Sequence, residues 1–439
     1  MTRFQDLGLA EPVLRAVTAE GYDQPTPIQA GVIPALLQGR DVLGLAQTGT
    51  GKTAAFVLPL IDALARSGRQ APGKTCTTLI LAPTRELAAQ IFDSAKRYGR
   101  HVKPSLALVT GGVKAGPQVR AMARGVDILV ATPGRLLDLM QSGAIRLDMT
   151  STVILDEADQ MLDLGFMPAI RKVMAALPAK RRTVLLSATL PGPIAKLAHE
   201  FLTNPVEVSV APQGTPVERI TQRVIHVPQS EKTGKLVELL APREVERAIV
   251  FTRTKRGADK VARALESAGL PAAAIHGNKS QNQRNRALDG LKSGQVRILV
   301  ATDIAARGID VSDVSHVVNF ELPNVPESYV HRIGRTARAG KGGEAISLCC
   351  GEETPLLRDI EKLTRMAIPA EGEPMAPPPG AKRPGGGGGG GRQRQNKGGG
   401  GQRQKQGQKQ GQGQNRGQGQ GGKAGGRKRR HRGPRRQAA

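Results

Sequence analysis

A glycine-rich segment, Ala46-Gln-Thr-Gly-Thr-Gly-Lys-Thr53, follows an apolar run and precedes a helical pattern. The backbone N–H groups of such a loop, with a helix N-terminus behind them, form a binding site for the phosphates of a nucleotide. Lys52 would reach the β- and γ-phosphates, and the Thr53 hydroxyl would bind Mg²⁺. The strict pattern has glycine where Ala46 stands, so an ordinary glycine-rich turn is the alternative for this segment taken alone.

An acidic segment, Asp156-Glu-Ala-Asp159, directly follows the apolar run Thr152–Leu155. Carboxylates just past the end of a parallel strand lie at the edge where an α/β sheet binds its ligand. We therefore expect Asp156 to hold Mg²⁺, directly or through water, and Glu157 to orient and deprotonate the attacking water. Asp159 could instead only cap the following helix.

A basic group lies in the segment Pro326–Arg338, which has Pro at its start and Gly340 after its end. These signals predict a helix that stops at Gly340. His331, Arg335 and Arg338 are then spaced i, i+4 and i+7 and would share one face. Two guanidinium groups that project together suit a γ-phosphate, and a solvated basic face is the alternative.

Short apolar runs precede these chemical groups throughout the chain and are predicted to be strands. Nearly all are uniformly apolar, which is typical of parallel strands buried on both faces, and helical patterns such as Glu86–Tyr98 and Met167–Ala176 separate them. Two consecutive series of this kind predict two doubly wound parallel-sheet α/β domains. The predicted strands are Asp41–Leu45, Thr78–Leu81, Leu106–Val109, Ile128–Val130, Val153–Leu155 and Thr183–Leu186 in the first series, and Ala248–Phe251, Ala272–Ile275, Ile298–Val300, Val314–Asn319 and Ala345–Leu348 in the second.

The domain boundaries are predicted from shifts in composition. A polar, proline-containing stretch at 211–218 is the expected linker between a domain at 1–210 and a domain at 219–370. The remainder, 371–439, is expected to be a disordered tail, since residues 381–439 hold 17 of the 64 Lys and Arg, 21 of the 54 Gly and none of the acidic residues. Such a segment cannot bury enough apolar surface to offset its conformational entropy.

Composition excludes several classes of protein. No run approaches the length of apolar sequence that a membrane span needs, and Asp6 and Glu11 argue against a secretory signal. Cys76, Cys349 and Cys350 match neither a disulfide framework nor a metal site, so we expect three small buried residues in a reducing cytosol. The formal net charge of +27 indicates a polyanionic partner, nucleic acid rather than anionic lipid.

Asp-Glu-Ala-Asp is the name-giving motif of the DEAD-box RNA helicases, and residues 1–370 resemble this family. Within the family the chain looks closest to the bacterial RhlE-type members, judging by 156–166 and 177–189. The resemblance implies two tandem RecA-like domains with ATP and Mg²⁺ as cofactors. It also implies catalytic roles for Glu157, Asp156, Lys52, Arg335 and Arg338.

The resemblance further implies how ATP is held. Gln29, in the segment Gly21–Gln29, would hydrogen-bond the adenine edge, and Phe4 would pack on the ring; otherwise Phe4 would pass for a core residue and Gln29 for a helix-surface residue. Asp310 would reach the ribose. The whole implied nucleotide set is Phe4, Tyr22, Gln24, Gln29, Thr48, Gly49, Thr50, Gly51, Lys52, Thr53, Asp310, Arg335 and Arg338, with Thr53 and Asp156 at the metal.

Loops that resemble the RNA-binding loops of the family follow several predicted strands. Arginines, hydroxyls and exposed glycine amides suit phosphate oxygens and 2′-hydroxyls. The implied RNA-binding residues are Pro83, Thr84, Arg85, Gly111, Gly112, Thr132, Pro133, Gly134, Arg135, Arg253, Gly277, Gln283, Arg286 and Thr302. The residues implied to couple the two domains are Asp159, Ser187, Thr189, Arg307 and His331, although Ser187 and Thr189 could simply cap a helix. The family usually has glycine where Ala337 stands.

These observations predict an RNA-dependent ATPase that locally and non-processively unwinds short RNA duplexes, or remodels ribonucleoprotein, through ATP-driven closure of two domains. The tail lacks aromatic residues, so we expect it to attract RNA phosphates without reading sequence. The alternatives are an ATP-gated RNA clamp or annealing chaperone in which the tail is the main RNA binder, and a DNA helicase. We expect a cytoplasmic monomer without membrane contact, whose partners beyond RNA are ribosomal or RNA-decay assemblies.

Overall fold

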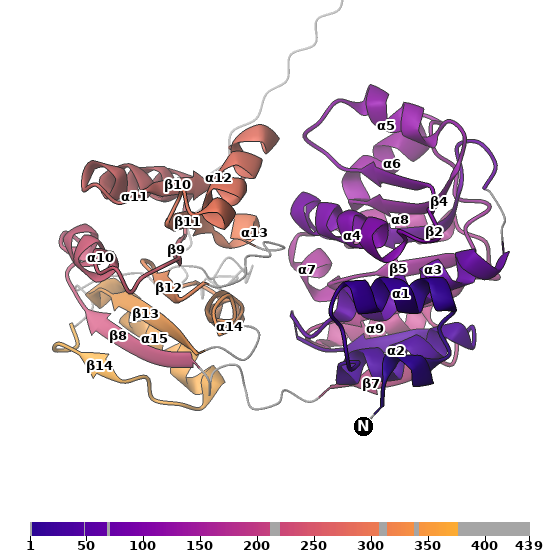
Figure 1. Ribbon diagram of the computed structural model, residues 1–439. Helices are drawn as coiled ribbons and strands as arrows, with labels where there is room; N and C mark the ends of the chain where they lie inside the picture. Colours follow the sequence, from indigo (N-terminus) through magenta and orange to yellow (C-terminus); the bar gives the residue numbers. More distant parts are fainter. Residues whose placement is uncertain are drawn as a thin grey trace, which may run out of the picture. The chain divides into compact units, whose positions relative to one another are not determined.

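The computed structural model describes residues 2–47, 49–67, 71–210, 220–306, 314–337 and 342–375. These residues form two seven-stranded sheets, one in each half of the chain, in which every strand pairing is parallel (Figure 1). We call the sheet of β1–β7 with its helices the first domain and the sheet of β8–β14 with its helices the second domain. The prediction of two parallel-sheet α/β domains is confirmed.

The first sheet has the strand order β3-β4-β2-β5-β6-β1-β7. Its central strands are buried along almost their whole length, because their uniformly apolar residues pack against helices on both faces. Its strands are β1 (Val42–Leu45), β2 (Cys76–Leu81), β3 (Leu106–Val109), β4 (Val126–Ala131), β5 (Thr152–Leu155), β6 (Arg182–Ser187) and β7 (Val206–Ser209).

Two separate hydrophobic layers cover the two faces of the first sheet. One layer holds Ile28, Phe56 and Leu87 and is built by η1 (Phe4–Leu7), α1 (Glu11–Ala19), α2 (Pro27–Leu37), α3 (Lys52–Ser67) and α4 (Arg85–Tyr98). The other holds Leu136 and Ile170 and is built by α5 (Ala115–Met122), α6 (Pro133–Gln141), α7 (Ala158–Asp163), α8 (Met167–Ala175) and α9 (Gly192–Phe201). The sheet is therefore fixed from both sides, and its strand ends are the natural place for ligands.

The second sheet repeats this plan with the order β10-β11-β9-β12-β13-β8-β14. Its strands are β8 (Ile220–His226), β9 (Ala248–Thr252), β10 (Ala272–Ile275), β11 (Ile298–Thr302), β12 (His316–Asn319), β13 (Gly343–Cys349) and β14 (Ala370–Glu371). The helices are α10 (Lys232–Leu240), α11 (Lys255–Ser267), α12 (Gln281–Ser293), α13 (Asp303–Ala306), α14 (Pro326–Ile333), η3 (Gly351–Glu353) and α15 (Thr354–Thr364).

All eleven predicted strands are present, with ends that differ by a few residues. Three further strands, β7, β8 and β14, were not predicted. Glu207 in β7 and Thr221 in β8 are exposed, so neither strand reads as a uniformly apolar run. The described structure also continues past the boundary expected at 370, because β14 pairs with β8 and Glu371 forms an ion pair with Arg223 at 2.8 Å.

The linker predicted at 211–218 lies outside the described residues, as does the tail from 376 onward. No helix in the described ranges is both long enough and apolar enough to cross a bilayer. The three cysteines are free and buried, as expected. Burial raises the pKa of the Cys76 and Cys349 thiols to about 12.

Candidate functional site

The chemical groups of the first half follow three neighbouring strands. Strands β5, β6 and β1 are adjacent in the sheet. They lead into Asp156–Asp159, Ser187–Thr189 and the glycine-rich segment Ala46–Thr53, respectively. Because the carboxyl ends of parallel strands meet at one edge, the fold brings these three segments together.

The glycine-rich segment has the backbone of a phosphate-binding loop. Gly49 and Gly51 have φ angles of +88° and +90°, which favour glycine. A Cβ on Gly51 would lie 2.4 Å from Nε2 of Gln29, so the loop and this side chain are in close contact. Helix α3 begins at Lys52 and directs its N-terminus at the loop. These features fit the phosphates of a nucleotide.

Gln29 joins the predicted adenine-binding segment to this loop. Its side chain is 5% exposed, accepts a hydrogen bond from the Thr26 N–H at 2.9 Å and donates one to the Gly51 carbonyl at 3.2 Å. The alternative interpretation of Gln29 as a helix-surface residue is therefore wrong.

Tyr22 is the exposed aromatic residue of this region. Phe4 is 1% exposed and belongs to the hydrophobic core, with its ring 6.4 Å from that of Tyr22. Tyr22 is 37% exposed, and its hydroxyl lies 3.1 Å from that of Tyr98. Tyr22 therefore offers an adenine ring accessible aromatic surface, whereas Phe4 offers almost none. Gln24 is exposed beside them.

Lys52 and Asp156 lie under the loop. Lys52 is 6% exposed, and its Nζ donates to the Ala46 carbonyl at 2.7 Å. Asp156 is 2% exposed and accepts a hydrogen bond from the Glu157 N–H at 3.0 Å. Burial raises the pKa of Asp156 to about 7; the Lys52 charge opposes this and the Glu157 charge reinforces it.

The donor set suits Mg²⁺ bound together with a nucleotide. Proteins usually hold Mg²⁺ through one or two carboxylates and the phosphates of a substrate. Asp156 supplies a buried carboxylate at the strand end, and Thr53 supplies a hydroxyl at the start of α3. Within the described residues no cluster of three His, Cys, Asp or Glu side chains could hold a metal by itself.

Glu157 has a strained backbone. Its φ and ψ are +53° and +54°, in the left-handed region, and it is the N-cap residue of α7. This conformation costs a non-glycine residue roughly 1–2 kcal/mol. Strained residues occur disproportionately at functional sites, so the conformation supports a functional role for this carboxylate, which is 3% exposed.

Asp159 connects the ends of β5 and β6. Its Oδ2 accepts hydrogen bonds from the N–H of Ala188 at 3.1 Å and from the N–H and hydroxyl of Thr189 at 3.0 and 3.1 Å. Ser187 in turn donates its hydroxyl to the Thr189 carbonyl at 2.6 Å. Asp159 lies inside α7, whose N-cap residue is Glu157, so it connects the two strand ends rather than only capping the helix. Thr189 bonds to both Asp159 and Ser187.

The predicted RNA-binding loops follow β3, β4 and β2, which are adjacent at the other side of the sheet, with β3 at its edge. Arg85 packs against the loop after β3: a Cβ on Gly112 would lie 1.8 Å from Arg85 Nη1, and one on Gly111 would lie 3.3 Å from Nη2. Thr84 caps α4 by accepting from the Leu87 N–H at 3.2 Å, and Pro83 beside it is buried. The arginine and the two glycines therefore form one surface.

The loop after β4 borders this surface. Thr132 is the N-cap residue of α6, Pro133 opens the helix, and Gly134 has open space around its Cα. Arg135 donates from Nη1 to the Val113 carbonyl at 3.0 Å, which ties this loop to the one after β3.

Gln118 was missed by the sequence reasoning. It is 6% exposed and exchanges two hydrogen bonds with the backbone of Thr110, at 3.1 and 3.0 Å, directly before the two glycines. Only its place three residues into α5 could have suggested a structural role.

In the second domain, β10, β11 and β9 are adjacent and lead to Gly277, Thr302 and Arg253. Gln283 and Arg286 lie exposed on α12. The Gln283 side chain accepts from the Ser280 N–H at 2.9 Å and so caps this helix.

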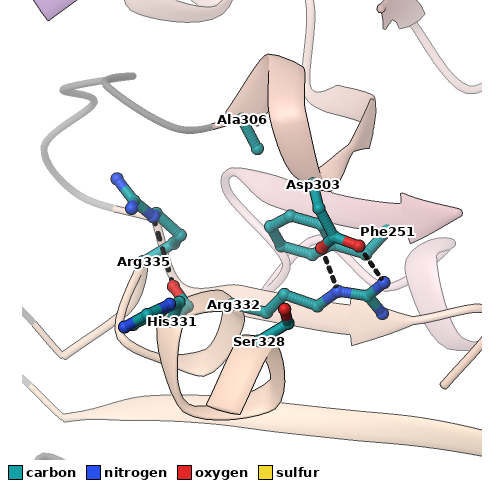
Figure 2. A pocket seen from close by; sticks show the side chains of 7 residues that line it. All are labelled: Phe251, Asp303, Ala306, Ser328, His331, Arg332 and Arg335. Atoms are coloured by element: carbon teal, nitrogen blue, oxygen red, sulfur yellow. Dashed lines mark hydrogen bonds and ion pairs between the residues drawn. The ribbon is translucent and has the colours of Figure 1, made fainter. Parts of the chain in front are cut away.

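The prediction of a continuous helix from Pro326 to Arg338 is wrong. Helix α14 ends at Ile333 with Gly334 as its cap, and Ala337 has a φ of +55°, which a helix does not allow. Arg335 therefore lies in the turn after the helix rather than on one helix face with His331. Its Nε donates to the His331 carbonyl at 3.3 Å (Figure 2). Thr48, Arg307, Asp310 and Arg338 fall outside the described residues.

Arg332 is a second residue that the sequence reasoning missed. It is 1% exposed and forms a two-pronged ion pair with Asp303, at 2.5 and 2.8 Å (Figure 2). It also donates to Asn319 Oδ1 at 3.1 Å and lies 5.0 Å from the centroid of the Phe251 ring. Arg332 thereby connects Asp303, directly after β11, and Phe251 of β9 to α14. The sequence spacing identified its neighbours His331 and Arg335 but gave no reason to select Arg332.

Residues 26–197 match the family model of the DEAD/DEAH box helicase, and residues 231–340 match that of the helicase conserved C-terminal domain. The DEAD-box ATP-dependent RNA helicase CshA of Bacillus subtilis (strain 168) is 43% identical over 371 residues, 84% of this chain and 74% of the relative. CshA of Bacillus cereus (strain ATCC 10987 / NRS 248) is 43% identical over 365 residues, 83% of this chain and 69% of the relative. Neither relative supports the finer resemblance to RhlE-type members.

Solved structures show the same likeness. S. cerevisiae Dbp5 bound to RNA and ADP BeF3 has a TM-score of 0.76 at 30% identity, over 84% of this chain and 96% of that chain. Mss116p (NTE and C-tail double deletion) bound to ssRNA and AMP-PNP has a TM-score of 0.76 at 29% identity, over 85% of this chain and 80% of that chain.

Proposed function

The chain belongs to the DEAD-box ATP-dependent RNA helicases, and on this basis we propose that it couples ATP hydrolysis to local, non-processive separation of short RNA duplexes. One observation carries the proposal: in the first sheet, the candidate residues for the two ligands follow different groups of strands. The groups suited to a nucleotide follow β5 and β1, with the coupling segment Ser187–Thr189 at the end of β6 between them, and those suited to an RNA backbone follow β3, β4 and β2. Two ligands can therefore bind side by side on one rigid sheet edge.

In the proposed mechanism the loop from Gly49 to Thr53 and the N-terminus of α3 bind the ATP phosphates. Mg²⁺, held by Asp156 and Thr53, would neutralise phosphate charge. Lys52 would move from the Ala46 carbonyl to the phosphates, a short rotation of a flexible side chain. Glu157 would take the proton of the attacking water.

The second domain would complete both sites. Arg335 and Arg338 would contact the γ-phosphate, where such arginines contribute roughly 10³–10⁵ in rate. Arg253, Gly277 and Thr302 would extend the RNA contacts. Closure of the two domains would bend the bound strand, so that it can no longer pair and its partner is released. Asp159, Ser187, Thr189, Arg307 and His331 would couple closure to hydrolysis.

The proposal is tested by comparing ATPase stimulation and strand displacement on matched substrates. We expect RNA to stimulate the ATPase and DNA of the same sequence not to, because the proposed contacts include 2′-hydroxyls. We expect a duplex of one helical turn to be separated and one of three turns to resist. Equal stimulation by DNA would indicate a DNA helicase, and processive separation of the long duplex would refute local unwinding.

The role of the tail is tested by deleting 381–439. If RNA-stimulated ATPase activity disappears with the tail, the RNA clamp or annealing chaperone is the better description.

Four further expectations stay predictions: closeness to RhlE-type members, remodelling of ribosomal or RNA-decay ribonucleoprotein, a cytoplasmic location and a monomeric state.

A further inference from the structure

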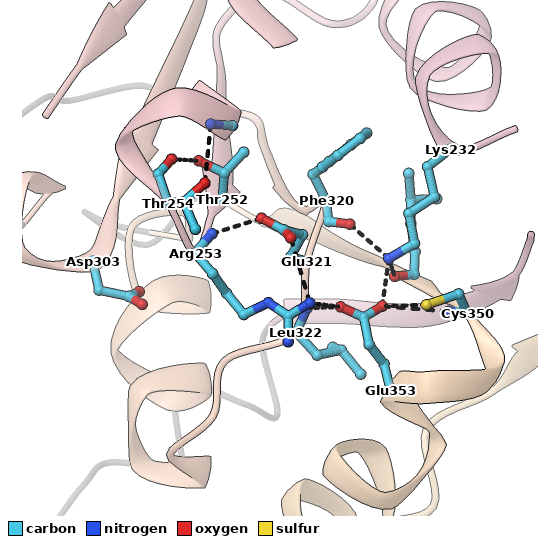
Figure 3. Close-up of polar contacts among 12 residues, drawn as sticks. Lys232, Thr252, Arg253, Thr254, Asp303, Phe320, Glu321, Leu322, Cys350 and Glu353 are labelled. Atoms are coloured by element: carbon cyan, nitrogen blue, oxygen red, sulfur yellow. Dashed lines mark hydrogen bonds and ion pairs between the residues drawn. The ribbon is translucent and has the colours of Figure 1, made fainter. Parts of the chain in front are cut away.

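A fully buried lysine lies at the start of α10. Lys232 is 0% exposed, and its Nζ donates to the carbonyls of Phe320 at 2.9 Å and Leu348 at 2.8 Å, and to Oε2 of Glu353 (Figure 3). A protonated amine has three N–H donors, and each of the three has an acceptor. The lysine is thereby held in one position, between the residue after β12, the strand β13 and η3.

Glu353 is the opposite charge of this pair and is also 0% exposed. Besides Lys232, its Oε2 accepts from the Cys350 N–H at 3.3 Å, and its Oε1 accepts from the Leu322 N–H at 3.1 Å. The same Oε1 lies 3.4 Å from Nη2 of Arg253. One carboxylate therefore connects a buried lysine with an arginine that is 25% exposed.

Arg253 is held from a second side by Glu321. Its N–H donates to Glu321 Oε2 at 2.8 Å, and its Nη2 lies 3.4 Å from Oε1 (Figure 3). Lys232, Arg253, Glu321 and Glu353 thus form a cluster of two positive and two negative charges, which we call the charge cluster. It lies at the carboxyl ends of β9, β12 and β13, the edge at which an α/β sheet binds its ligand.

Stability alone is a weak reason for such a cluster. Desolvation offsets much of the attraction within a buried ion pair, and replacing the whole pair by apolar residues is often neutral or stabilising. An apolar pair could not present a fixed carboxylate to Arg253. A guanidinium has five N–H donors, so it can bond to carboxylates on one side and to a phosphate on the other.

We propose that Lys232 and Glu353 are positioning residues that hold the Arg253 guanidinium in the orientation in which it binds an RNA phosphate. Lys232 neutralises and fixes Glu353, and Glu353 together with Glu321 fixes Arg253. The inference rests on the proposed function, in which Arg253 contacts RNA. A purely structural role for the pair would change stability without changing RNA affinity.

The test uses the full chain and compares Lys232→Met/Glu353→Gln with Arg253→Ala. The paired substitution removes both buried charges, so no unpaired charge is left behind. The matched control is Lys235→Met/Glu238→Gln, which removes the ion pair on the exposed face of the same helix, at 3.0 Å. Fluorescence anisotropy measures binding of a single-stranded oligoribonucleotide with a non-hydrolysable ATP analogue, over a series of salt concentrations.

We expect Arg253→Ala to weaken RNA binding about tenfold or more, because a charge-assisted hydrogen bond is lost. The slope of log affinity against log salt should become shallower by about 0.7, the value for one phosphate contact on a single strand. Lys232→Met/Glu353→Gln should weaken binding severalfold and change the slope in the same direction. Combined with Arg253→Ala it should add nothing, since it acts through that side chain. The control pair should leave affinity and slope unchanged.

A folded Lys232→Met/Glu353→Gln variant with unchanged affinity and slope would overturn the inference. If Arg253→Ala still weakened binding, the proposed function would stand. An Arg253→Ala variant that binds RNA like the parent would overturn both the inference and the RNA contact. If the paired variant does not fold, Glu353→Asp gives the decision: it keeps a negative charge within the charge cluster but draws the carboxylate back from Arg253 by one methylene. Unchanged affinity and slope in that variant would equally refute the positioning role.

Discussion

Substitution of Asp159 tests the connection between β5 and β6. In Asp159→Ala, the N–H groups of Ala188 and Thr189 and the Thr189 hydroxyl lose their shared acceptor. A hydrogen bond to a charged group contributes about 1.5–3 kcal/mol, but three donors on one oxygen do not add fully. Because the three bonds are only partly buried, water can replace some of what is lost. We therefore expect the free energy of unfolding of the first domain to fall by about 3 kcal/mol.

Two milder variants should lower the free energy of unfolding by smaller amounts. Asp159→Asn keeps an acceptor oxygen, and Thr189→Val removes one of the three donors, so each should cost about 1 kcal/mol. Asp148→Asn is the control, because Asp148 is 57% exposed in an ion pair with Arg146 at 3.5 Å, and exposed pairs contribute about 0–1 kcal/mol. Hydrogen exchange measures the result, since the chain has no Trp to serve as a fluorescent probe.

Hydrogen exchange at two backbone amides tests this prediction directly. In Asp159→Ala we expect the amides of Ala188 and Thr189 to lose protection first, while the amides of β2 and β4 keep theirs. Strand displacement should fall further than RNA-stimulated ATPase activity, because the proposed role of Asp159 is coupling. Unchanged protection at residues 188 and 189, or an equal loss across the whole sheet, would refute the local connection.

Three further predictions concern other residues. Glu157→Gln should lower turnover by roughly 10²–10⁴, the contribution of a general base, while ATP-dependent RNA binding persists. Glu207→Gln, on the exposed face of β7, is the control. Normal turnover in Glu157→Gln would exclude Glu157 as the base. Ala337→Gly should stabilise the second domain by about 0.5–1 kcal/mol in thermal unfolding, because relief of the left-handed φ of +55° exceeds the entropy that glycine adds to the unfolded chain; a lower melting temperature would contradict this. Cys76 and Cys349 should resist a thiol reagent at pH 8 in the folded chain and react after denaturation, since burial raises their pKa to about 12. Because an unfolded thiol has a pKa of about 8.5, the unfolded chain releases these protons first, so the free energy of unfolding should fall as pH rises from about 8.5 to 12.

The uniformly apolar strands were predictable because burial on both faces leaves a direct signature in the sequence. Runs such as Val153–Leu155 have no polar position and no helical period. Strand β7 alternates between half-buried and exposed residues, β8 mixes polar and apolar residues without a regular period, and two-residue β14 has no pattern of its own. These three were missed because neighbouring strands, rather than their own residues, determine that they join the sheet.

The residues suited to a nucleotide stand out in the sequence for a different reason, and their role stays a prediction. Glycines with positive φ, a lysine and carboxylates at strand ends are residue types with few other uses in that order. The residues that were missed, such as Gln118, Arg332 and Lys232, are polar side chains buried by partners elsewhere in the chain. Arg332 bonds to Asp303, 29 positions away, and Lys232 to Glu353, 121 positions away. Helical and strand periodicity reports only on neighbours a few residues apart, so it cannot find such pairs.

The border between the two groups of the first sheet is a single strand pair. Leu81 of β2 lies opposite Leu155 of β5, and the Asp156 N–H donates to the Leu81 carbonyl at 3.0 Å. Across this bond, the carboxylate suited to the nucleotide lies close to the loop that carries Arg85, which begins directly after β2. A close-packed sheet has little freedom to shift. We therefore expect that binding of one ligand to the first domain leaves its affinity for the other ligand unchanged. In the proposed mechanism, coupling would then require the second domain, in which Arg332 connects Asp303 after β11 and Phe251 of β9 to the helix that precedes Arg335.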